Sequence, residues 1–241
     1  MRFITFLLFS AIAMADDGPA GQLPTANEVV ARMVAYDNQR QATFHGYTAY
    51  RHYLLDNQRF HKRAEMIVRI TCLQNGSKEF DTIYETGWGG ARKHVFSKLL
   101  EAETEASQPG YRERSRITPE NYTFEMAGAE TLHGHPVYVM TIVPKTPNKY
   151  LMRGRIWVDA EEYAIVRIEG QPAKNPSFWI KSVQFVHNYE KSGSFWLAVS
   201  DRSETEARIF GSTEVTIEYF NYNLDTPSLS ATAEPVRKEL P

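Results

Sequence analysis

The stretch Arg153–Gly170, RGRIWVDAEEYAIVRIEG, has the clearest strand-pairing pattern in this sequence of 241 residues. A hairpin register that sets Ile156 opposite Ile168 makes one face of the strand pair aliphatic. Val158 then stands opposite Val166 on that same face. Alternation of this kind is typical of two strands with one buried side, so the sequence predicts a β-hairpin.

The other face of the hairpin is aromatic and charged. Trp157 falls opposite Arg167, which allows a cation–π contact. Arg155 falls opposite Glu169, an opposite-charge pair across the strands. The tip, residues 161–163, is polar like a solvated connection, but it lacks the Asn-Gly pair of a two-residue turn.

The first fifteen residues, MRFITFLLFSAIAMA, have the pattern of a secretory signal peptide. A basic residue, Arg2, precedes an apolar run too short to span a bilayer, and residues 13–15 match a cleavage site. Cleavage after Ala15 leaves Asp16 at the position where a lipidated bacterial protein needs cysteine. We therefore expect an exported, soluble periplasmic protein; an uncleaved membrane anchor is the alternative.

Composition excludes several classes of function. The formal net charge is −2, with 27 basic and 29 acidic residues, so nothing basic enough for nucleic-acid binding is present. The single cysteine, Cys72, cannot form a disulfide within the chain. Its alternating row with Met66, Val68 and Ile70 predicts a buried, inert thiol.

After a flexible leader over residues 16–24, the sequence predicts a helix from Ala26 to about Gln39. Thr25 stands at the N-cap and Glu28 follows three residues later, which is the capping-box pattern. Apolar residues then recur at helical spacing. Their stripe needs a partner, and the sheet that is predicted next is the candidate.

Aromatic and β-branched segments separated by turn residues predict three strands, near residues 44–55, 60–74 and 78–86. Asn75-Gly76 marks the hairpin turn between the second and the third. Because the links are short, these strands must be antiparallel.

A second helix, Ala91 to about Ala106, interrupts this run of strands. Its apolar face includes Phe96 and Leu99, and its acidic residues form a solvated face. A helix in this position must lie across a sheet face or cover its opening. Residues 107–120 are polar and contain Pro109-Gly110, so we predict a loop there.

The remainder of the chain returns to strand patterns. With the hairpin, the total is about ten or eleven strands and two helices in one domain, residues 25–225, followed by a flexible tail, 226–241. The further predicted strands are 122–126, 137–143, 178–189, 195–199, 202–210 and 214–222.

Motifs for nucleophilic, phosphoryl-transfer and zinc-hydrolase chemistry are absent from the sequence. His133 and His135 are the only closely spaced histidines, and no third ligand accompanies them, so a surface pair is favoured over a metal site. We expect no enzyme activity, no cofactor and no bound metal.

Some strand segments are apolar on both faces, among them residues 138–142 and 178–180. One interpretation is a sheet covered on one face by helices and touched on the other by loops. The other is a curved sheet whose concave face takes an acyl chain or another hydrophobic ligand.

One succession of segments surrounds the hairpin. It comprises Asn121-Tyr122, Tyr138 with Pro144-Lys145, Tyr150-Leu151, PAKNPSFWIKSVQFVHNY, GSFWLAV and SETEARIFG. Together these segments resemble bacterial exported proteins described as outer-membrane lipoprotein-sorting proteins. Those proteins are similar in plan to the periplasmic carrier LolA, the receptor LolB and the regulator RseB. The likeness runs from about Ala26 to Tyr222.

The resemblance implies a mainly β fold: a single antiparallel sheet curled into an unclosed barrel, two helices over the opening and a hydrophobic cavity between. The helix at residues 91–106 becomes a candidate lid with its apolar face turned inward. The residues then expected to line the cavity are Phe96, Leu99, Ile156, Val158, Val166 and Ile168, for which ordinary packed core is the alternative.

Under this resemblance, the leading hypothesis is a periplasmic carrier that binds acyl chains of lipoproteins or another hydrophobic ligand. Each methylene removed from water contributes about 0.8 kcal/mol, so an acyl chain can be held tightly. The alternative is an RseB-like envelope sensor or scaffold that binds a protein partner without transport.

Overall fold

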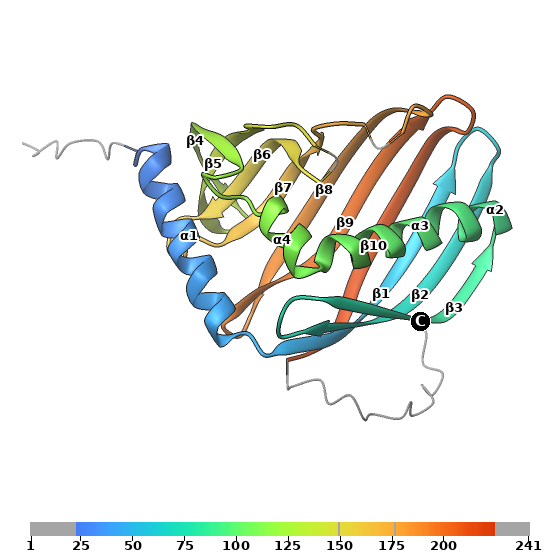
Figure 1. The fold of residues 1–241 in the computed structure, drawn as a ribbon, viewed down its shortest axis with the longest axis horizontal. Coiled ribbons are helices and arrows are strands. Elements are labelled where there is room, and N and C mark those ends of the chain that lie inside the picture. The colour runs from blue at the N-terminus through green and yellow to red at the C-terminus, as the bar shows by residue number, and fades with distance from the viewer. Residues whose placement is uncertain (1–22, 149, 176, 225–241) are drawn as a thin grey trace, which may run out of the picture.

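The computed structural model describes residues 23–148, 150–175 and 177–224. Over these residues the chain forms one ten-stranded antiparallel sheet that curls without closing into a barrel (Figure 1). The mainly β fold class is thereby confirmed. The predicted signal peptide, nearly all of the predicted leader and the predicted tail lie outside the described residues.

The strand order across the sheet is β3-β2-β1-β10-β9-β8-β7-β6-β5-β4. The strands are β1 (Gly46–Asn57), β2 (Lys62–Leu73), β3 (Lys78–Gly87), β4 (Tyr122–Leu132), β5 (His135–Pro144), β6 (Met152–Asp159), β7 (Ile165–Pro172), β8 (Ile180–Ser192), β9 (Phe195–Ala207) and β10 (Gly211–Asn223). The helices are α1 (Ala26–Thr43), α2 (Gly89–Ala91), the π-helical segment η1 (Arg92–Phe96), α3 (Ser97–Ser107) and α4 (Pro109–Ser115).

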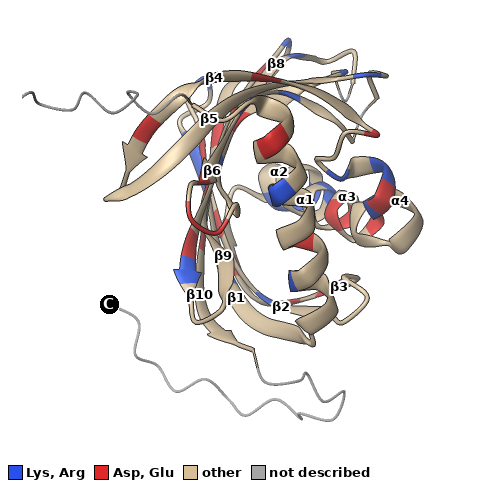
Figure 2. Ribbon diagram, turned by 90° about the vertical axis from the view of Figure 1, so that its left-hand side faces the viewer, with Lys and Arg blue, Asp and Glu red and all other residues tan. Residues whose placement is uncertain are grey.

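The helical connection joins the two edge strands of the sheet. β1 pairs with β10 in the middle, so β3 and β4 lie at opposite edges although they are neighbours in the sequence of strands. The segment from α2 to α4 runs between them along the concave side, where α1 also lies (Figures 1 and 2). The helix predicted to interrupt the strands therefore covers the open side of the sheet.

Several strand boundaries differ from the prediction; β4, for example, runs to Leu132 instead of ending at residue 126. Segment 195–199 and the first part of segment 202–210 belong to the single strand β9, which ends at Ala207. The polar residue between them, Asp201, does not mark a turn, because its carboxylate faces two partners on neighbouring strands, His187 and Tyr219. β8 begins at Ile180, two residues later than predicted.

The loop predicted for residues 107–120 is wrong in its first half. α4 occupies Pro109–Ser115 and starts with proline in its first turn, where a missing N–H costs the helix nothing. The prolines and glycine that indicated a loop therefore also suit a short helix. This helix matters because it carries Arg112 to the concave side of the sheet.

α1 is capped as predicted. The Thr25 hydroxyl oxygen accepts a hydrogen bond from the Glu28 backbone N–H at 3.3 Å, and the Glu28 carboxylate accepts from the Thr25 backbone N–H at 2.8 Å. The helix continues to Thr43, four residues beyond the predicted end.

Two buried apolar clusters fill the concave side under the helices. The first, which we call the α1 cluster, packs α1 on β4–β7 and comprises Val29, Val30, Met33, Tyr122, Met140, Ile142, Leu151, Ile156, Val158 and Ile168. The second, the α3 cluster, packs α2 and η1 on β1, β2 and β10 and comprises Tyr53, Leu55, Ala64, Met66, Val68, Ala91, Phe96 and Val215.

The β6–β7 hairpin has the predicted register over most of its length. Ile156 pairs with Ile168, and both face the α1 cluster. Val158, however, pairs with Ile165 across a register shift. The predicted pairing of Val158 with Val166 is therefore wrong, and Val166 packs on the opposite face of the sheet.

The register shift arises at the hairpin tip. The buried Asp159 carboxylate accepts hydrogen bonds from the backbone N–H groups of Glu161 at 3.0 Å and Glu162 at 2.7 Å. Tyr163 takes a positive φ of 60°, and Ala164 accepts a hydrogen bond from the Asp159 backbone N–H at 2.9 Å. The extra residue lies in β7 rather than in the turn: Val166 falls between the Trp157–Arg167 pair and the Val158–Ile165 pair and has no partner on β6, which is a β-bulge.

Trp157 has its predicted partner, Arg167, and two further partners on the outer face of the hairpin. The Arg167 guanidinium carbon lies 5.5 Å from its ring centroid and that of Arg155 lies 5.1 Å away. Its indole N–H donates to Glu130 on β4 at 2.6 Å. Trp157 is thus held between two cations and a carboxylate, over a small apolar cluster that includes Val166.

Gly154 and Gly170 stand opposite each other in the hairpin because the strands approach too closely there for a side chain. A Cβ at Gly154 would come within 2.0 Å of the Glu169 carbonyl oxygen. We expect Gly154→Ala to lower the free energy of unfolding by about 2 kcal/mol in urea denaturation, since the strands must separate. Gly110→Ala in α4, where nothing lies within 4 Å of the added carbon, is the control and should be neutral or stabilising.

Candidate functional site

A cavity with two adjoining chambers lies between α1, α4 and the concave face of the sheet. The α1 chamber measures about 290 Å³ and the β10 chamber about 360 Å³. Five residues line both chambers and so form their junction: Arg40, Gln41, Arg112, Tyr189 and Trp196.

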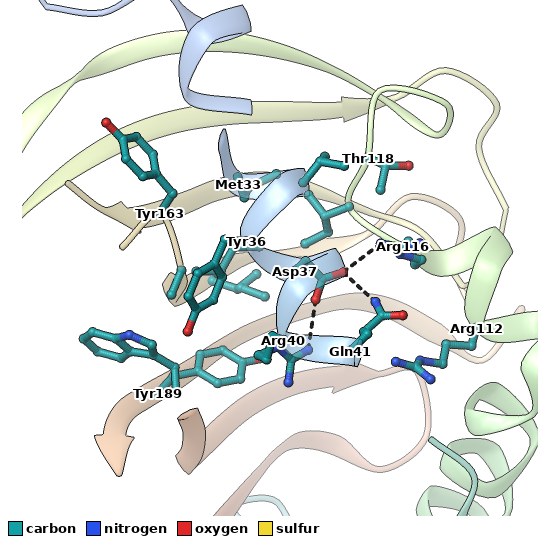
Figure 3. A pocket seen from close by; sticks show the side chains of 16 residues that line it. Met33, Tyr36, Asp37, Arg40, Gln41, Arg112, Arg116, Thr118, Tyr163 and Tyr189 are labelled. Atoms are coloured by element: carbon teal, nitrogen blue, oxygen red, sulfur yellow. Dashed lines mark hydrogen bonds and ion pairs between the residues drawn. The ribbon is translucent and has the colours of Figure 1, made fainter. Parts of the chain in front are cut away.

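The α1 chamber is lined largely by apolar and aromatic side chains, from α1 as well as from the sheet (Figure 3). α1 contributes Met33 and Val34 through the same helical spacing that builds the α1 cluster. The residues with apolar or aromatic side chains in its wall are Met33, Val34, Tyr36, Ile117, Tyr163, Ala164, Ile165, Ile168, Tyr189 and Trp196.

Asp37 organises the polar side of the α1 chamber. Its carboxylate lies 3.0 Å from the Arg40 guanidinium, 2.7 Å from the Gln41 amide nitrogen and 2.8 Å from the Arg116 guanidinium (Figure 3). Burial alone raises the pKa of this carboxyl, but the bonds to Arg40 and Arg116 outweigh it and hold the pKa below its ordinary value. Asp37 thus neutralises much of the positive charge of two arginines and ties α1 to the segment that follows α4.

The β10 chamber is lined by tyrosines and by a charged triad. The triad joins β1, β3 and α3, because the Glu103 carboxylate lies 2.6 Å from Arg51 and 2.6 Å from Lys78. Arg51 is only 1% exposed and its guanidinium lies over the Tyr219 ring, 4.6 Å from the centroid. The triad therefore holds α3 against β1 and β3 at the inner wall of the chamber.

The triad remains charged over a wide pH range. Burial opposes the ionisation of Glu103, but Lys78 and Arg51 outweigh it and hold the pKa of this carboxyl well below its ordinary value of 4.5. Burial likewise opposes the charge on Lys78, and Glu103 outweighs it and raises the pKa of the amine.

The tyrosines of the β10 chamber are hydrogen-bond donors at neutral pH. Burial and the nearby Asp201 raise the pKa of Tyr189 to about 12. Burial first, and Asp201 second, also raise the pKa of Tyr219, whose hydroxyl donates to Asp201. Asp201 in turn lies 2.6 Å from a ring nitrogen of His187.

Arg112 differs from the other cations in the cavity walls. Its guanidinium donates to the Asn75 carbonyl oxygen at 2.9 Å, at the β2–β3 turn. Gly76 leaves room for it, because a Cβ there would lie 2.2 Å from an Arg112 nitrogen. Across the described ranges it is the one arginine or lysine of the cavity wall without a carboxylate at ion-pair distance.

The cavity as a whole has an excess of positive charge. Its walls contain the basic residues Arg40, Arg51, Lys78, Arg112 and Arg116 against the acidic residues Asp37, Glu103 and Asp201. This excess occurs in a chain whose formal net charge is −2. The chambers therefore favour an anionic guest over a cationic one.

The residues predicted to line a cavity are mostly packed elsewhere. Of the six, Ile168 lies in the wall of the α1 chamber. Ile156 and Val158 are fully buried in the α1 cluster, and Phe96 is fully buried in the α3 cluster.

Val166 and Leu99 lie away from the concave side or at its periphery. Val166 is on the outer face of the sheet, as the register shift requires. Leu99 is 39% exposed, and the neighbouring Leu100 packs against the α3 cluster instead. The prediction that Leu99 turns inward is therefore wrong.

Two site residues left different signals in the sequence. Arg51 interrupts the apolar row of Ala49, Tyr53 and Leu55 on β1, and a charge in such a row indicates a buried ion pair. Arg112 left no such signal, because its segment was predicted as a loop.

Cys72 is buried as predicted, and burial raises the pKa of its thiol.

No group of three or more histidine, cysteine, aspartate or glutamate side chains is placed to hold a metal ion within the described residues. No helix among these residues is both long and apolar enough to cross a membrane. His133 lies at the β4–β5 turn with a positive φ of 49°.

The chain is similar to several known proteins at low sequence identity. A protein family described as "Uncharacterized protein" matches residues 111–229, and no curated protein matches the chain. A DUF1329 family protein from Desulfovibrio piger is 13% identical, with a TM-score of 0.48 over 87% of this chain and 97% of that one.

Two further structures carry the names that the sequence suggested. A putative outer membrane lipoprotein-sorting protein domain from Vibrio parahaemolyticus is 14% identical, with a TM-score of 0.41 over 82% of this chain and 94% of that one. A LolA superfamily protein from Nitrosomonas europaea is 8% identical, with a TM-score of 0.39 over 84% of this chain and 94% of that one. The chain is similar to these proteins in plan. At such identities the likeness concerns the fold alone.

Proposed function

We propose that this protein binds acyl-chain amphiphiles in its two chambers and carries them through the periplasm without catalysing a reaction on them. The observation that supports this is the junction of an apolar chamber with a basic, tyrosine-rich one. Hydrocarbon placed in the α1 chamber gains about 0.8 kcal/mol per methylene removed from water. The predicted signal peptide supports a periplasmic location.

The guest fits best with its hydrocarbon in the α1 chamber and its head group at the junction. Arg112 offers a guanidinium without a carboxylate partner among the described residues, and a guanidinium binds a carboxylate or phosphate through two parallel hydrogen bonds. Protonated Tyr189 adjoins it as a further wall residue. The proposed ligand class is therefore an acyl chain with an anionic head.

Arg112→Gln tests the head-group part of the proposal. With a fluorescent fatty acid as probe, we expect the variant to bind about tenfold more weakly than wild type, because one charge-assisted contact is lost. The methyl ester of the same probe should bind wild type and Arg112→Gln with affinities that agree within about twofold. Fluorescence titration measures both. Arg114→Gln is the matched control, since Arg114 lies on the same helix with its guanidinium over the Tyr111 ring, 4.7 Å from the centroid.

Val34→Trp tests the hydrocarbon part. Val34 lies in the wall of the α1 chamber, and a larger side chain there fills the space without removing a charge. Uptake of the acid and of the ester should fall together, which separates this variant from Arg112→Gln. Wild-type protein that takes up neither probe and carries no extractable lipid when isolated from its native periplasm would contradict the proposal.

The RseB-like alternative predicts a different result in the same preparation. A sensor or scaffold should retain one stoichiometric protein partner from an envelope extract, whereas a carrier should hold transient clients. One partner in constant ratio, together with no uptake of either probe, would favour the sensor.

A further inference from the structure

One rim of the sheet carries exposed aromatic and basic residues that ligand binding in the chambers does not use. We call it the aromatic rim and define it by four segments. They are residues 58–62 at the β1–β2 turn, residues 88–93 at the start of the helical connection, residues 177–181 at the start of β8, and residues 207–211 at the β9–β10 turn. It follows the end of β1, whereas Phe44 and Tyr47 of the β10 chamber lie at the beginning of that strand.

Contacts between the segments make the rim one surface. The rings of Phe60, Trp88 and Phe210 form a triangle with centroid separations of 6.0, 6.4 and 6.4 Å. The Asn57 side-chain amide donates to the Phe210 carbonyl oxygen at 2.9 Å and so holds the two hairpin tips together. These rings therefore have defined positions at the surface.

The segment at the start of β8 is joined to the same surface through Arg208. The Arg208 backbone N–H donates a hydrogen bond to the Trp179 carbonyl oxygen at 2.9 Å. The Arg208 side-chain Nε–H donates to the Phe178 carbonyl oxygen at 3.0 Å. The Arg208 guanidinium also lies 4.8 Å from the centroid of the Phe178 ring.

The rim exposes much more apolar surface than a solvated turn needs. Phe178 is 74% exposed and Trp179 is 55% exposed, and Phe60, Ile209 and Phe210 are each between 43% and 51% exposed. Contiguous exposed apolar side chains of this size mark an interaction site. Their fixed positions on four separate segments argue against accidental exposure.

The rim is basic as well as aromatic. Its four segments contain six basic residues and no acidic one, within a chain of net charge −2. Lys181 pairs with Glu206 at 3.2 Å and Arg92 pairs with Glu85 at 3.1 Å, on the adjoining strands. The other four, Arg59, Lys62, Lys93 and Arg208, have no carboxylate at ion-pair distance within the described part of the chain.

We infer that the aromatic rim docks this protein onto an anionic lipid bilayer surface. Tryptophan and phenylalanine side chains partition into the boundary between head groups and acyl chains, and lysine and arginine beside them attract anionic lipids. The charge complementarity favours this surface over a soluble partner. The inference is independent of the proposed function, because no rim residue lines either chamber.

Vesicle sedimentation with the full-length mature protein tests the docking. We expect binding to phosphatidylglycerol–phosphatidylcholine vesicles at least tenfold stronger than to pure phosphatidylcholine vesicles, weakening as salt is raised. The double variant Phe178→Ser, Trp179→Ser should lose at least tenfold in binding. Ile83→Ser with Tyr84→Ser is the matched control, because these β3 residues are 49% and 48% exposed in mid-strand, and its binding should stay within about twofold of wild type.

The far-ultraviolet circular dichroism of both double variants should equal that of wild type, since the four side chains replaced are exposed. Uptake of the fluorescent fatty acid should also be unchanged in both, which keeps a failure of docking distinct from a failure of ligand binding. Wild-type protein that binds neither kind of vesicle, or binds both equally, would overturn the inference. An unchanged affinity of the Phe178, Trp179 double variant would overturn it as well.

Discussion

Replacing Phe96 with alanine is expected to lower the free energy of unfolding by about 3–5 kcal/mol. Phe96 is fully buried where η1 meets the sheet, and its ring packs edge-on against that of Tyr53 with centroids 5.9 Å apart. The substitution removes apolar area from the α3 cluster and leaves a cavity that rigid strands cannot close. No other side chain of the helical connection is both aromatic and fully buried within the described residues.

Leu99→Ala on the same helical connection is the control for Phe96→Ala. Leu99 is 39% exposed, so its truncation should cost less than about 1 kcal/mol. Urea denaturation followed by circular dichroism measures both variants, with equal m-values required for the comparison. Equal losses in the two variants would show that the helix faces the sheet differently from the structure described.

This pair of residues shows why the orientation of the helix was only half predictable. An apolar stripe drawn from the sequence joins Phe96 to Leu99, because both are large and hydrophobic. The inner line of the helix keeps Leu100, which the sequence also placed on the apolar face, but it leaves Leu99 outside and continues through Glu103 and Ser107. Two of those residues are polar and face inward because their partners lie on β1 and β3, which a helical pattern alone does not contain.

The hairpin was predictable up to its tip for a similar reason. Strand alternation set Ile156 opposite Ile168 and Trp157 opposite Arg167, and both pairings are present. The pairing of Val158 depended on the hydrogen bonds that the Asp159 side chain accepts from the backbone of the tip. Such side-chain contacts do not recur at a regular spacing, so the strand pattern does not predict them. The pairing of Val158 with Ile165 leaves Val166 as one additional residue in β7, and this bulge moves Val166 to the other face of the sheet.

The site was less predictable than the sheet. Its wall is assembled from α1, α3, α4, strands β1 to β3 and strands β7 to β10, which are far apart in the sequence. Arg40 and Arg112 are 72 positions apart in the numbering and read as ordinary surface arginines in their own segments. The pattern of apolar residues in the sequence therefore predicted the residues of the packed clusters. The cavity lies instead where polar residues prevent such packing.

Glu103→Gln is expected to lower the free energy of unfolding by about 3 kcal/mol at neutral pH. The substitution keeps the size of the side chain but leaves Arg51, which is 1% exposed, and Lys78 without their shared carboxylate. A buried guanidinium without a counter-charge must either attract water into the β10 chamber or draw the helical cover out of place. Glu101→Gln is the matched control, because the Glu101 carboxylate is 61% exposed and its pairing with Lys98 contributes about 0.5 kcal/mol or less.

The pH dependence of the Glu103→Gln effect has a defined sign. The pKa of Glu103 is lowered in the folded protein, so its stabilisation is fully present above the ordinary value of 4.5 and is lost as the pH falls through the folded value. The difference in unfolding free energy between wild type and Glu103→Gln should therefore be constant from pH 5 to pH 8 and shrink below about pH 4.5. Urea denaturation at a series of pH values measures it. If this free-energy difference grew on acidification, the folded protein would favour the protonated form of Glu103. The ion pairs of the triad would then not be what holds α3 to the strands.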